Sequence, residues 1–139
     1  MSNSSQSINT VVSTINFNSY GYTIKLIDSL LRANLSSCRV VICDNSSNDD
    51  SCANIDNHLQ KIDWLSKKKL DIDSHQIATA QLFLANNDVE FIFLQLCENY
   101  GFAKANNIAY EYINKLTTFN YFWLLNNDTT ILNTTLPAL

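Results

Sequence analysis

Two hydrophobic periods alternate along this sequence, and this alternation is the feature that most constrains its fold. Short β-branched and apolar runs are separated by segments whose apolar residues recur every three or four positions. The apolar runs predict strands at residues 8–15, 39–43, 91–96 and 121–125. The helical spacing predicts helices at residues 22–34, 52–62 and 108–116. Such alternation predicts an α/β fold, with right-handed crossovers that place helices on a mostly parallel sheet.

The segments between and before these elements have weaker patterns. Residues 1–7 are polar and are expected to form a disordered tail, which leaves one domain over residues 8–139. Ile77, Ala80, Leu84 and Ala85 have helical spacing and predict a short helix, whereas residues 67–69 are three lysines that predict a solvated corner.

Three residues predict where the first two helices begin and end. Asn34 is the expected C-cap of the first helix. Ser47 and Asp50 are the expected N-cap and first-turn acid of the second helix.

The rarest residue types exclude several classes of enzyme. Gly21 and Gly101 are the two glycines of the chain, so a dinucleotide fingerprint, a P-loop and a nucleophile elbow are all excluded. The two histidines, His58 and His75, are too far apart for a zinc-protease motif and have no partner pattern. Nine basic and thirteen acidic residues give a net charge of -4, which argues against a nucleic-acid-binding module.

The four cysteines have neither CxxC nor zinc-site spacing. Cys43 and Cys97 lie in apolar runs and are expected to be buried. The longest apolar runs are far shorter than the roughly 20 residues of a membrane-spanning helix, and the first residues do not resemble a secretion signal. The sequence therefore predicts a cytoplasmic protein with reduced thiols, without a transmembrane segment, and attached to a membrane surface only through something outside this chain.

A polar cluster directly follows each predicted strand. The four clusters are residues 16–18 (Asn-Phe-Asn), 44–47 (Asp-Asn-Ser-Ser), 99–101 (Asn-Tyr-Gly) and 126–128 (Asn-Asn-Asp). Asn and Asp are common turn residues, so each cluster alone can be explained by turn chemistry. Ligands of open α/β sheets bind beyond the carboxyl ends of the strands, however, so four clusters on one rim predict a binding site.

The four clusters resemble, in order and at similar spacing, the motifs of family 2 glycosyltransferases with the GT-A fold. The resembling segments are residues 16–18 (the end of the first strand), 40–49 (VVVDNxSxD), 99–107 (NxGFAxxNN) and 124–129 (LLNNDT, a form of the DXD metal motif). The resemblance extends from about residue 9 to the last residue and is closest to the rhamnosyltransferase-like branch. It implies a GT-A fold, that of nucleotide-diphospho-sugar transferases.

The resemblance also implies roles for individual residues. Asp44 matches the acid that hydrogen-bonds a pyrimidine base, and Phe17 and Asn18 match the lining of the nucleoside pocket. Asp128 matches the acid that binds a divalent cation, Mg²⁺ or Mn²⁺, between the two phosphates. Asn127 belongs to the same donor site.

Five further residues near these motifs have open or weaker assignments. Asn126 replaces the first acid of the DXD motif, so the cation is expected to bind weakly without the diphosphate. Asn107 is also placed in the donor site, although Asn106 and Asn107 could equally brace the donor loop or cap a helix. Lys104 could reach a phosphate but is expected to be solvated. Gly101 is expected to meet a backbone need, either positive φ or close approach.

The implied activity is sugar transfer from a UDP- or dTDP-sugar to a glycan or lipid-linked acceptor, with inversion, as in polysaccharide biosynthesis. No catalytic residue is assigned, because the general base of the family lies well after the DXD-like segment and Leu139 ends the sequence eleven residues past Asp128. We therefore expect the donor-binding half of a transferase, truncated. The alternatives are a non-catalytic nucleotide-binding remnant and a flavodoxin-like or receiver-like domain.

Overall fold

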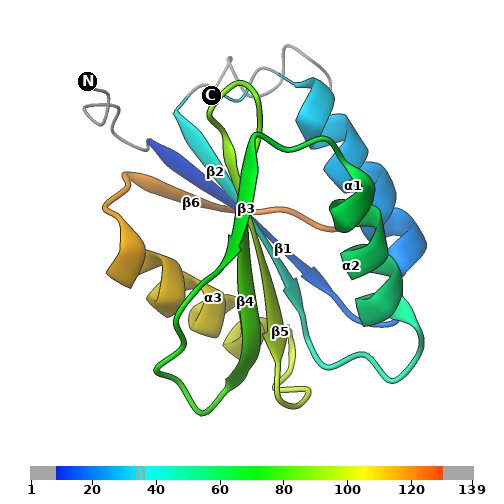
Figure 1. Cartoon of the computed structure of the whole chain (residues 1–139). Helices are drawn as coiled ribbons and strands as arrows, with labels where there is room; N and C mark the ends of the chain where they lie inside the picture. The colour runs from blue at the N-terminus through cyan, green and yellow to red at the C-terminus, as the bar shows by residue number, and fades with distance from the viewer. Residues whose placement is uncertain (1–8, 34, 36, 130–139) are drawn as a thin grey trace.

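The computed structural model of the chain describes residues 9–33, 35 and 37–129. In this part of the chain, helices flank a single sheet whose strands lie in the order β3-β4-β5-β2-β1-β6 (Figure 1). In chain order the elements are β1 (Thr10–Asn16), α1 (Tyr20–Arg32), β2 (Cys38–Asp44), α2 (Ser51–Lys61), β3 (Ser66–Lys69), β4 (Ile77–Leu84), β5 (Glu90–Leu96), α3 (Phe102–Leu116) and β6 (Tyr121–Leu124). The expected strands and helices of the alternating pattern are therefore confirmed.

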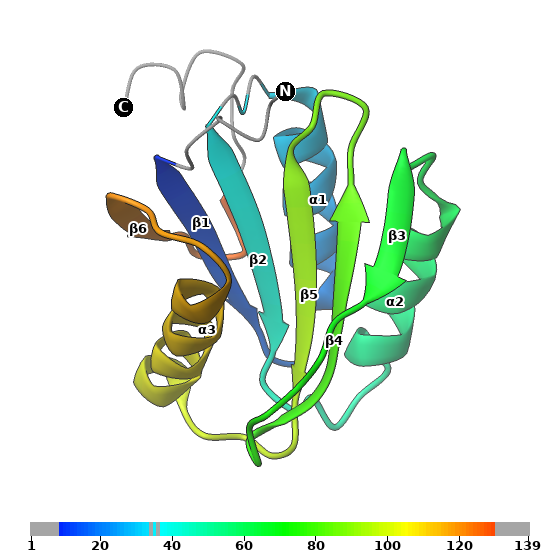
Figure 2. The ribbon, with the colours of Figure 1, turned by 60° about the vertical axis from the view of Figure 1, so that its left-hand side comes forward.

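The sheet is mostly parallel, as the alternation predicts. β1 pairs in parallel with β2 and β6, and β2 pairs in parallel with β5, whereas β4 is antiparallel to both β5 and β3. Because parallel strands end at the same edge of a sheet, β1, β2 and β5 all end at one edge (Figure 2). β6 pairs with the first half of β1, and the segment that follows β6 begins beside Ser13 of β1.

The core consists of two layers, one on each face of the sheet. α1 and α2 cover one face and α3 covers the other (Figure 2). The first layer includes Val12, Leu26, Ile27, Leu30, Val40, Ile42, Ile55, Leu59, Phe91 and Phe93. The second includes Val11, Val41, Cys43, Ile92, Leu94, Ala105, Ile108, Ala109, Tyr112 and Ile113. β2 and β5 contribute to both layers, which explains why their sequences are apolar throughout instead of alternating.

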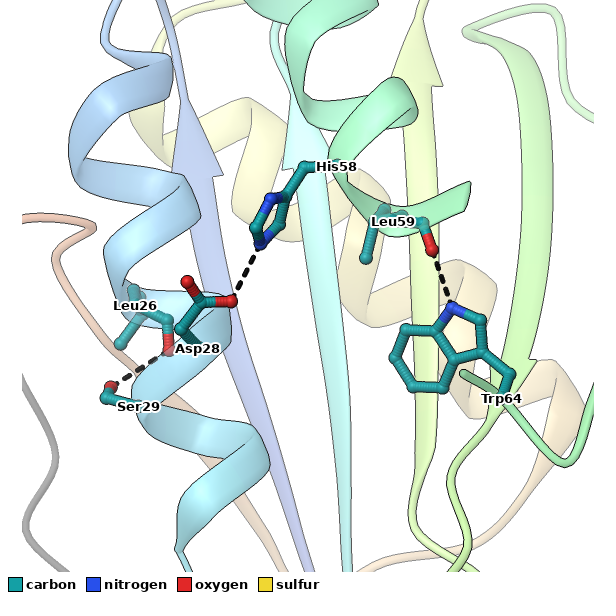
Figure 3. Close-up of polar contacts among 6 residues, drawn as sticks. All are labelled: Leu26, Asp28, Ser29, His58, Leu59 and Trp64. Atoms are coloured by element: carbon teal, nitrogen blue, oxygen red, sulfur yellow. Dashed lines mark hydrogen bonds and ion pairs between the residues drawn. The ribbon is translucent and has the colours of Figure 1, made fainter. Parts of the chain in front are cut away.

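Polar contacts fix the two helices of the first layer. The Nε2 atom of His58 on α2 lies 2.7 Å from Oδ1 of Asp28 on α1, so this histidine has a structural partner (Figure 3). The indole N–H of Trp64 donates to the carbonyl of Leu59 at 2.7 Å, which ties the segment after α2 to the last turn of this helix (Figure 3).

The short helix expected around residues 77–85 is wrong, because this segment forms strand β4. The register of β4 on β5 shifts between Ile77 and Thr79, which is a β-bulge. The extra residue places Ile77 and Ala80, three apart, in the same core layer. The bulge therefore gives the buried residues of this strand the three-residue spacing that is typical of a helix. The lysines expected at a corner lie instead in the edge strand β3, with exposed side chains.

Two smaller expectations are also corrected. α2 begins at Ser51 with Asp50 as its N-cap residue, so Ser47 does not cap this helix. Cys97 is exposed because β5 ends at Leu96, whereas Cys43 is buried as expected. Asn34, the expected C-cap of α1, lies outside the described residues.

All four cysteines are free. Within the described ranges, no helix combines the length and apolar character needed to cross a bilayer.

Candidate functional site

A cavity of about 450 Å³ opens at the carboxyl edge of the parallel strands. All four polar clusters contribute to its lining, which consists of Ile15, Phe17, Ser19, Asn45, Asn99, Gly101, Phe102, Asn126, Asn127 and Asp128. Clusters that are as far as 110 residues apart in the sequence are therefore neighbours around one cavity, as expected for a binding site at the rim of an open α/β sheet.

Two aromatic side chains give this cavity apolar surface. Phe17 follows β1 and Phe102 begins α3, and both are exposed although they are large apolar residues. Exposed aromatic faces that line a polar cavity are suited to stacking against a planar base. The expectation for Phe17 therefore has a geometric basis.

Asp44 is not part of the cavity lining and is only 2% exposed. Its Oδ1 accepts hydrogen bonds from Asn16 Nδ2 at 2.8 Å and from Ser47 Oγ at 2.7 Å. Its Oδ2 accepts a third from the backbone N–H of Ser47 at 3.0 Å. These bonds compensate for the cost of burying a carboxylate. They also show what Ser47 does in place of capping α2.

Asn18 also lies outside the lining. Its side chain connects the loop after β1 to the loop after β2. Its Nδ2 donates to Asn48 Oδ1 at 2.7 Å, and its Oδ1 accepts from the Asn48 backbone N–H at 3.0 Å. The φ of Asn18 is +53°, a left-handed conformation that asparagine tolerates better than most residues. The side chain thus shapes the loop that carries Phe17.

A second set of contacts holds the loop between β5 and α3. Asn45 donates to Asn99 Oδ1 at 2.9 Å and accepts from the backbone N–H of Tyr100 at 3.0 Å. Gly101 has a φ of +84°, and a Cβ atom added there would meet nothing within 4 Å. Its backbone need is therefore positive φ rather than close approach. Lys104 is exposed with its Nζ 5.1 Å from the centre of the Tyr100 ring.

The two asparagines of α3 have different environments. Asn106 is buried, accepts the Ser13 hydroxyl at 3.3 Å and donates to the carbonyl of Phe102 at 3.2 Å. Asn107 is exposed and does not line the cavity. Asn106 therefore joins α3 to β1, and the structure does not place Asn107 in the lining of the cavity.

The segment after β6 forms the remaining wall of the cavity. The backbone N–H of Leu125 donates to the Ser13 carbonyl at 2.8 Å, which keeps this segment beside β1. Asn127 Nδ2 donates to Ser19 Oγ at 2.6 Å and to Thr23 Oγ1 at 3.0 Å. Asp128 is exposed and, among the described residues, is the only charged one in the lining.

The residues of the cavity fit a divalent cation that takes some of its ligands from a bound phosphate. They fit a cation bound by protein groups alone less well. Among the described residues, no group of three His, Cys, Asp or Glu side chains could hold a metal ion. Asp128 offers one carboxylate, and its neighbours Asn126 and Asn127 offer amide oxygens. Mg²⁺ and Mn²⁺ commonly use one or two carboxylates and take their other ligands from substrate phosphates and water.

Ser19 and Thr23 are the site residues that the sequence motifs missed. Both lie at the start of α1, and Thr23 is fully buried between Asn16 and Asn127. The signal that could have found Thr23 is a hydroxyl residue on the buried, mostly apolar face of an amphipathic helix, close to the end of β1.

No protein-family model and no curated protein sequence matches this chain. Solved structures do match it. The mannosyltransferase PcManGT from Pyrobaculum calidifontis, solved with GDP-Man and Mn²⁺, has a TM-score of 0.61 at 13% identity over 91% of this chain. S. aureus TarS 1-349 has a TM-score of 0.59 at 19% identity over 94% of this chain, and its complex with UDP-GlcNAc has a TM-score of 0.60.

These matches show a GT-A glycosyltransferase fold, in agreement with the motif resemblance. This chain spans only 30% of TarS 1-349 and 29% of the mannosyltransferase, so it corresponds to less than a third of either.

Proposed function

We propose that this chain binds a nucleoside-diphosphate-sugar in the cavity at the carboxyl edge of its sheet, as the donor-binding part of a family 2 glycosyltransferase. The observation that carries the proposal is the convergence of all four motif-like segments on that cavity. Its support from other proteins is the shared GT-A fold, seen in structures solved with UDP-GlcNAc and with GDP-Man and Mn²⁺.

Phe17 and Asp44 are the residues proposed for the base. The Phe17 ring stacks on the base, and Asp44 receives the imide N–H of uracil or thymine, which makes a UDP- or dTDP-sugar the preferred donor. A carboxylate has about four acceptor positions, and three are already filled. The base therefore takes the last position or displaces the Ser47 hydroxyl, while Asn18 holds the loop and makes no contact with the ligand.

Asp128 is the residue proposed for the cation, with the amide oxygens of the two preceding asparagines in support. Mg²⁺ or Mn²⁺, when bound, neutralises the charge of the diphosphate. Because the described part of the chain gives the lining a single carboxylate, we expect the cation to enter together with the nucleotide.

The proposed reaction is inverting transfer to a glycan or lipid-linked acceptor in polysaccharide synthesis, as in the rhamnosyltransferase-like branch. Inversion requires a general base beside the acceptor hydroxyl. Asp128 is the only carboxylate of the lining and is assigned to the cation, so the described residues supply donor binding without that base. This observation favours the second candidate, nucleotide binding without transfer, for the chain acting alone.

Thermal unfolding with and without ligand tests the proposal. UDP or dTDP with Mn²⁺ should raise the melting temperature, because a ligand at 100 times its Kd stabilises a fold by about 2.7 kcal/mol. Asp44→Ala and Asp128→Ala should each remove the stabilisation, and Asp63→Ala, an exposed acid after α2, should keep it. Stabilisation by a flavin instead, or by none of the nucleoside diphosphates, would contradict the donor-site assignment.

A further inference from the structure

A continuous row of hydrogen bonds leads from Asp44, at the end of β2, to Asn127, in the segment after β6. The row passes through Asn16 and Thr23, which are both fully buried, and through Ser19 beside them. It connects the residue proposed for the base with the segment proposed for the diphosphate and its cation.

The carboxylate of Asp44 sets the direction of the first bond. A carboxylate only accepts hydrogen bonds, so the Asn16 amide must turn its NH₂ group toward Asp44. The Asn16 Oδ1 atom therefore faces the other way, where it accepts the Thr23 hydroxyl at 2.6 Å and the Ser19 hydroxyl at 3.3 Å.

The two hydroxyls determine which end of the Asn127 amide faces them. A hydroxyl has one hydrogen, and Thr23 and Ser19 have both given theirs to Asn16. Toward Asn127 they can only accept, and Asn127 Nδ2 donates to both. Both hydrogens of this amide are thus engaged by protein hydroxyls, and its Oδ1 is the polar atom left to bind a ligand, since Asn127 lines the cavity.

We propose that this relay fixes Asn127 so that its Oδ1 joins the Asp128 carboxylate as a second hard oxygen ligand for the divalent cation. Asn16 and Thr23 are then positioning residues, because they act through Asn127 without touching the ligand. The cation half of this inference rests on the proposed function, whereas the relay itself depends only on the polarity of the hydrogen bonds.

Variants of Thr23 separate a relay from a merely structural role. Thr23→Val keeps the shape and removes the hydroxyl, and Thr23→Ser restores the hydroxyl. Thr14→Val is a matched control: Thr14 is buried in β1, and within the described part of the chain its Oγ1 has no hydrogen-bond partner. Ser19→Ala, at a half-buried position, tests the second branch if Thr23→Val does not fold.

The first measurement is the side-chain amide signal of Asn127 in the ¹⁵N spectrum of the full chain, identified by its loss in Asn127→Ala. We expect Thr23→Val to shift this signal and both Thr23→Ser and Thr14→Val to leave it in place. Asp44→Asn should also shift the Asn127 signal, acting through Asn16 and Thr23. An amide at position 44 can donate as well as accept, so it no longer fixes the orientation of the Asn16 amide. An unmoved signal in Thr23→Val and Asp44→Asn overturns the relay.

The second measurement is Mn²⁺ titration by electron paramagnetic resonance in the presence of UDP. Thr23→Val should weaken Mn²⁺ binding about five- to tenfold, the effect of losing one oriented ligand, with Thr23→Ser and Thr14→Val unchanged. Unchanged Mn²⁺ affinity in Thr23→Val overturns the assignment of Asn127 to the cation. If the unmodified chain binds no UDP, the proposed function fails, and the amide signal still decides for or against the relay.

Discussion

The two sides of the cavity differ in how far their polar groups are already partnered. On the side of β1 and β2, Asn16 and Asp44 are 0% and 2% exposed and are held by several hydrogen bonds each. On the side of β6, Asn126 and Asp128 are exposed, while Asn127 between them is held by hydrogen bonds. The polar groups of the first side are therefore satisfied within the folded protein, whereas Asn126 and Asp128 on the second, open side are left for a ligand. Substitutions on the first side should reduce stability, and substitutions of the exposed residues on the open side should reduce binding alone.

The largest effect is expected for Asn16→Ala. This change removes a donor from a buried carboxylate and leaves the Thr23 hydroxyl without its acceptor. Hydrogen bonds to charged groups contribute about 1.5–3 kcal/mol each, so we expect the free energy of unfolding in urea to fall by about 3 kcal/mol.

Asn18→Ala is the comparison for this variant, since Asn18 makes exposed hydrogen bonds at the same rim. It should cost less than half as much as Asn16→Ala. Equal losses in the two variants would mean that the buried side is no more dependent on its hydrogen bonds than the exposed loop.

A smaller effect is expected for Gly101→Ala, on the wall formed by the loop between β5 and α3. The space around Gly101 is open, so the cost comes from a φ of +84° alone. With a ψ of 163°, this residue lies in a backbone region that is essentially restricted to glycine, and it costs a residue with a Cβ atom roughly 1–3 kcal/mol, measurable as a lower midpoint in urea.

Gly21→Ala gives the opposite sign and serves as the control. Gly21 lies in the first turn of α1 with nothing near its Cβ position, and its φ is not positive. Alanine is favoured over glycine in a helix by up to about 1 kcal/mol, so this variant should be more stable. A destabilised Gly21→Ala together with an unaffected Gly101→Ala would contradict the backbone argument.

The fold and the position of the site could be predicted from the sequence, whereas the orientation of individual side chains could not. β1, β2 and β5 follow from β-branched runs whose length fits buried strands, and the polar clusters follow from the rule that ligands bind beyond strand ends. The orientation of Asp44 did not follow, because a motif records that an acid is present and does not record which way it points. β4 was missed because its bulge gives Ile77 and Ala80 the spacing of a helix.

The relay was missed for a similar reason. Thr23 is one of two hydroxyl residues on the buried face of α1, and its role depends on Asn16 and Asn127, which are 7 and 104 residues away. Local periodicity carries no information about such pairings.

The smallest effect on stability is expected for Asp128→Ala, on the open side. Asp128 is exposed, and within the described ranges its carboxylate makes no hydrogen bond or ion pair, so folding gains little from it. We expect the free energy of unfolding in urea to change by less than about 0.5 kcal/mol, the usual range for such surface positions. Stabilisation by UDP with Mn²⁺ should nevertheless disappear, whereas Asn16→Ala should lower stability both with and without the ligand. A large loss of stability in ligand-free Asp128→Ala would show that the open side is also built by folding, and the contrast between the two sides would then fail.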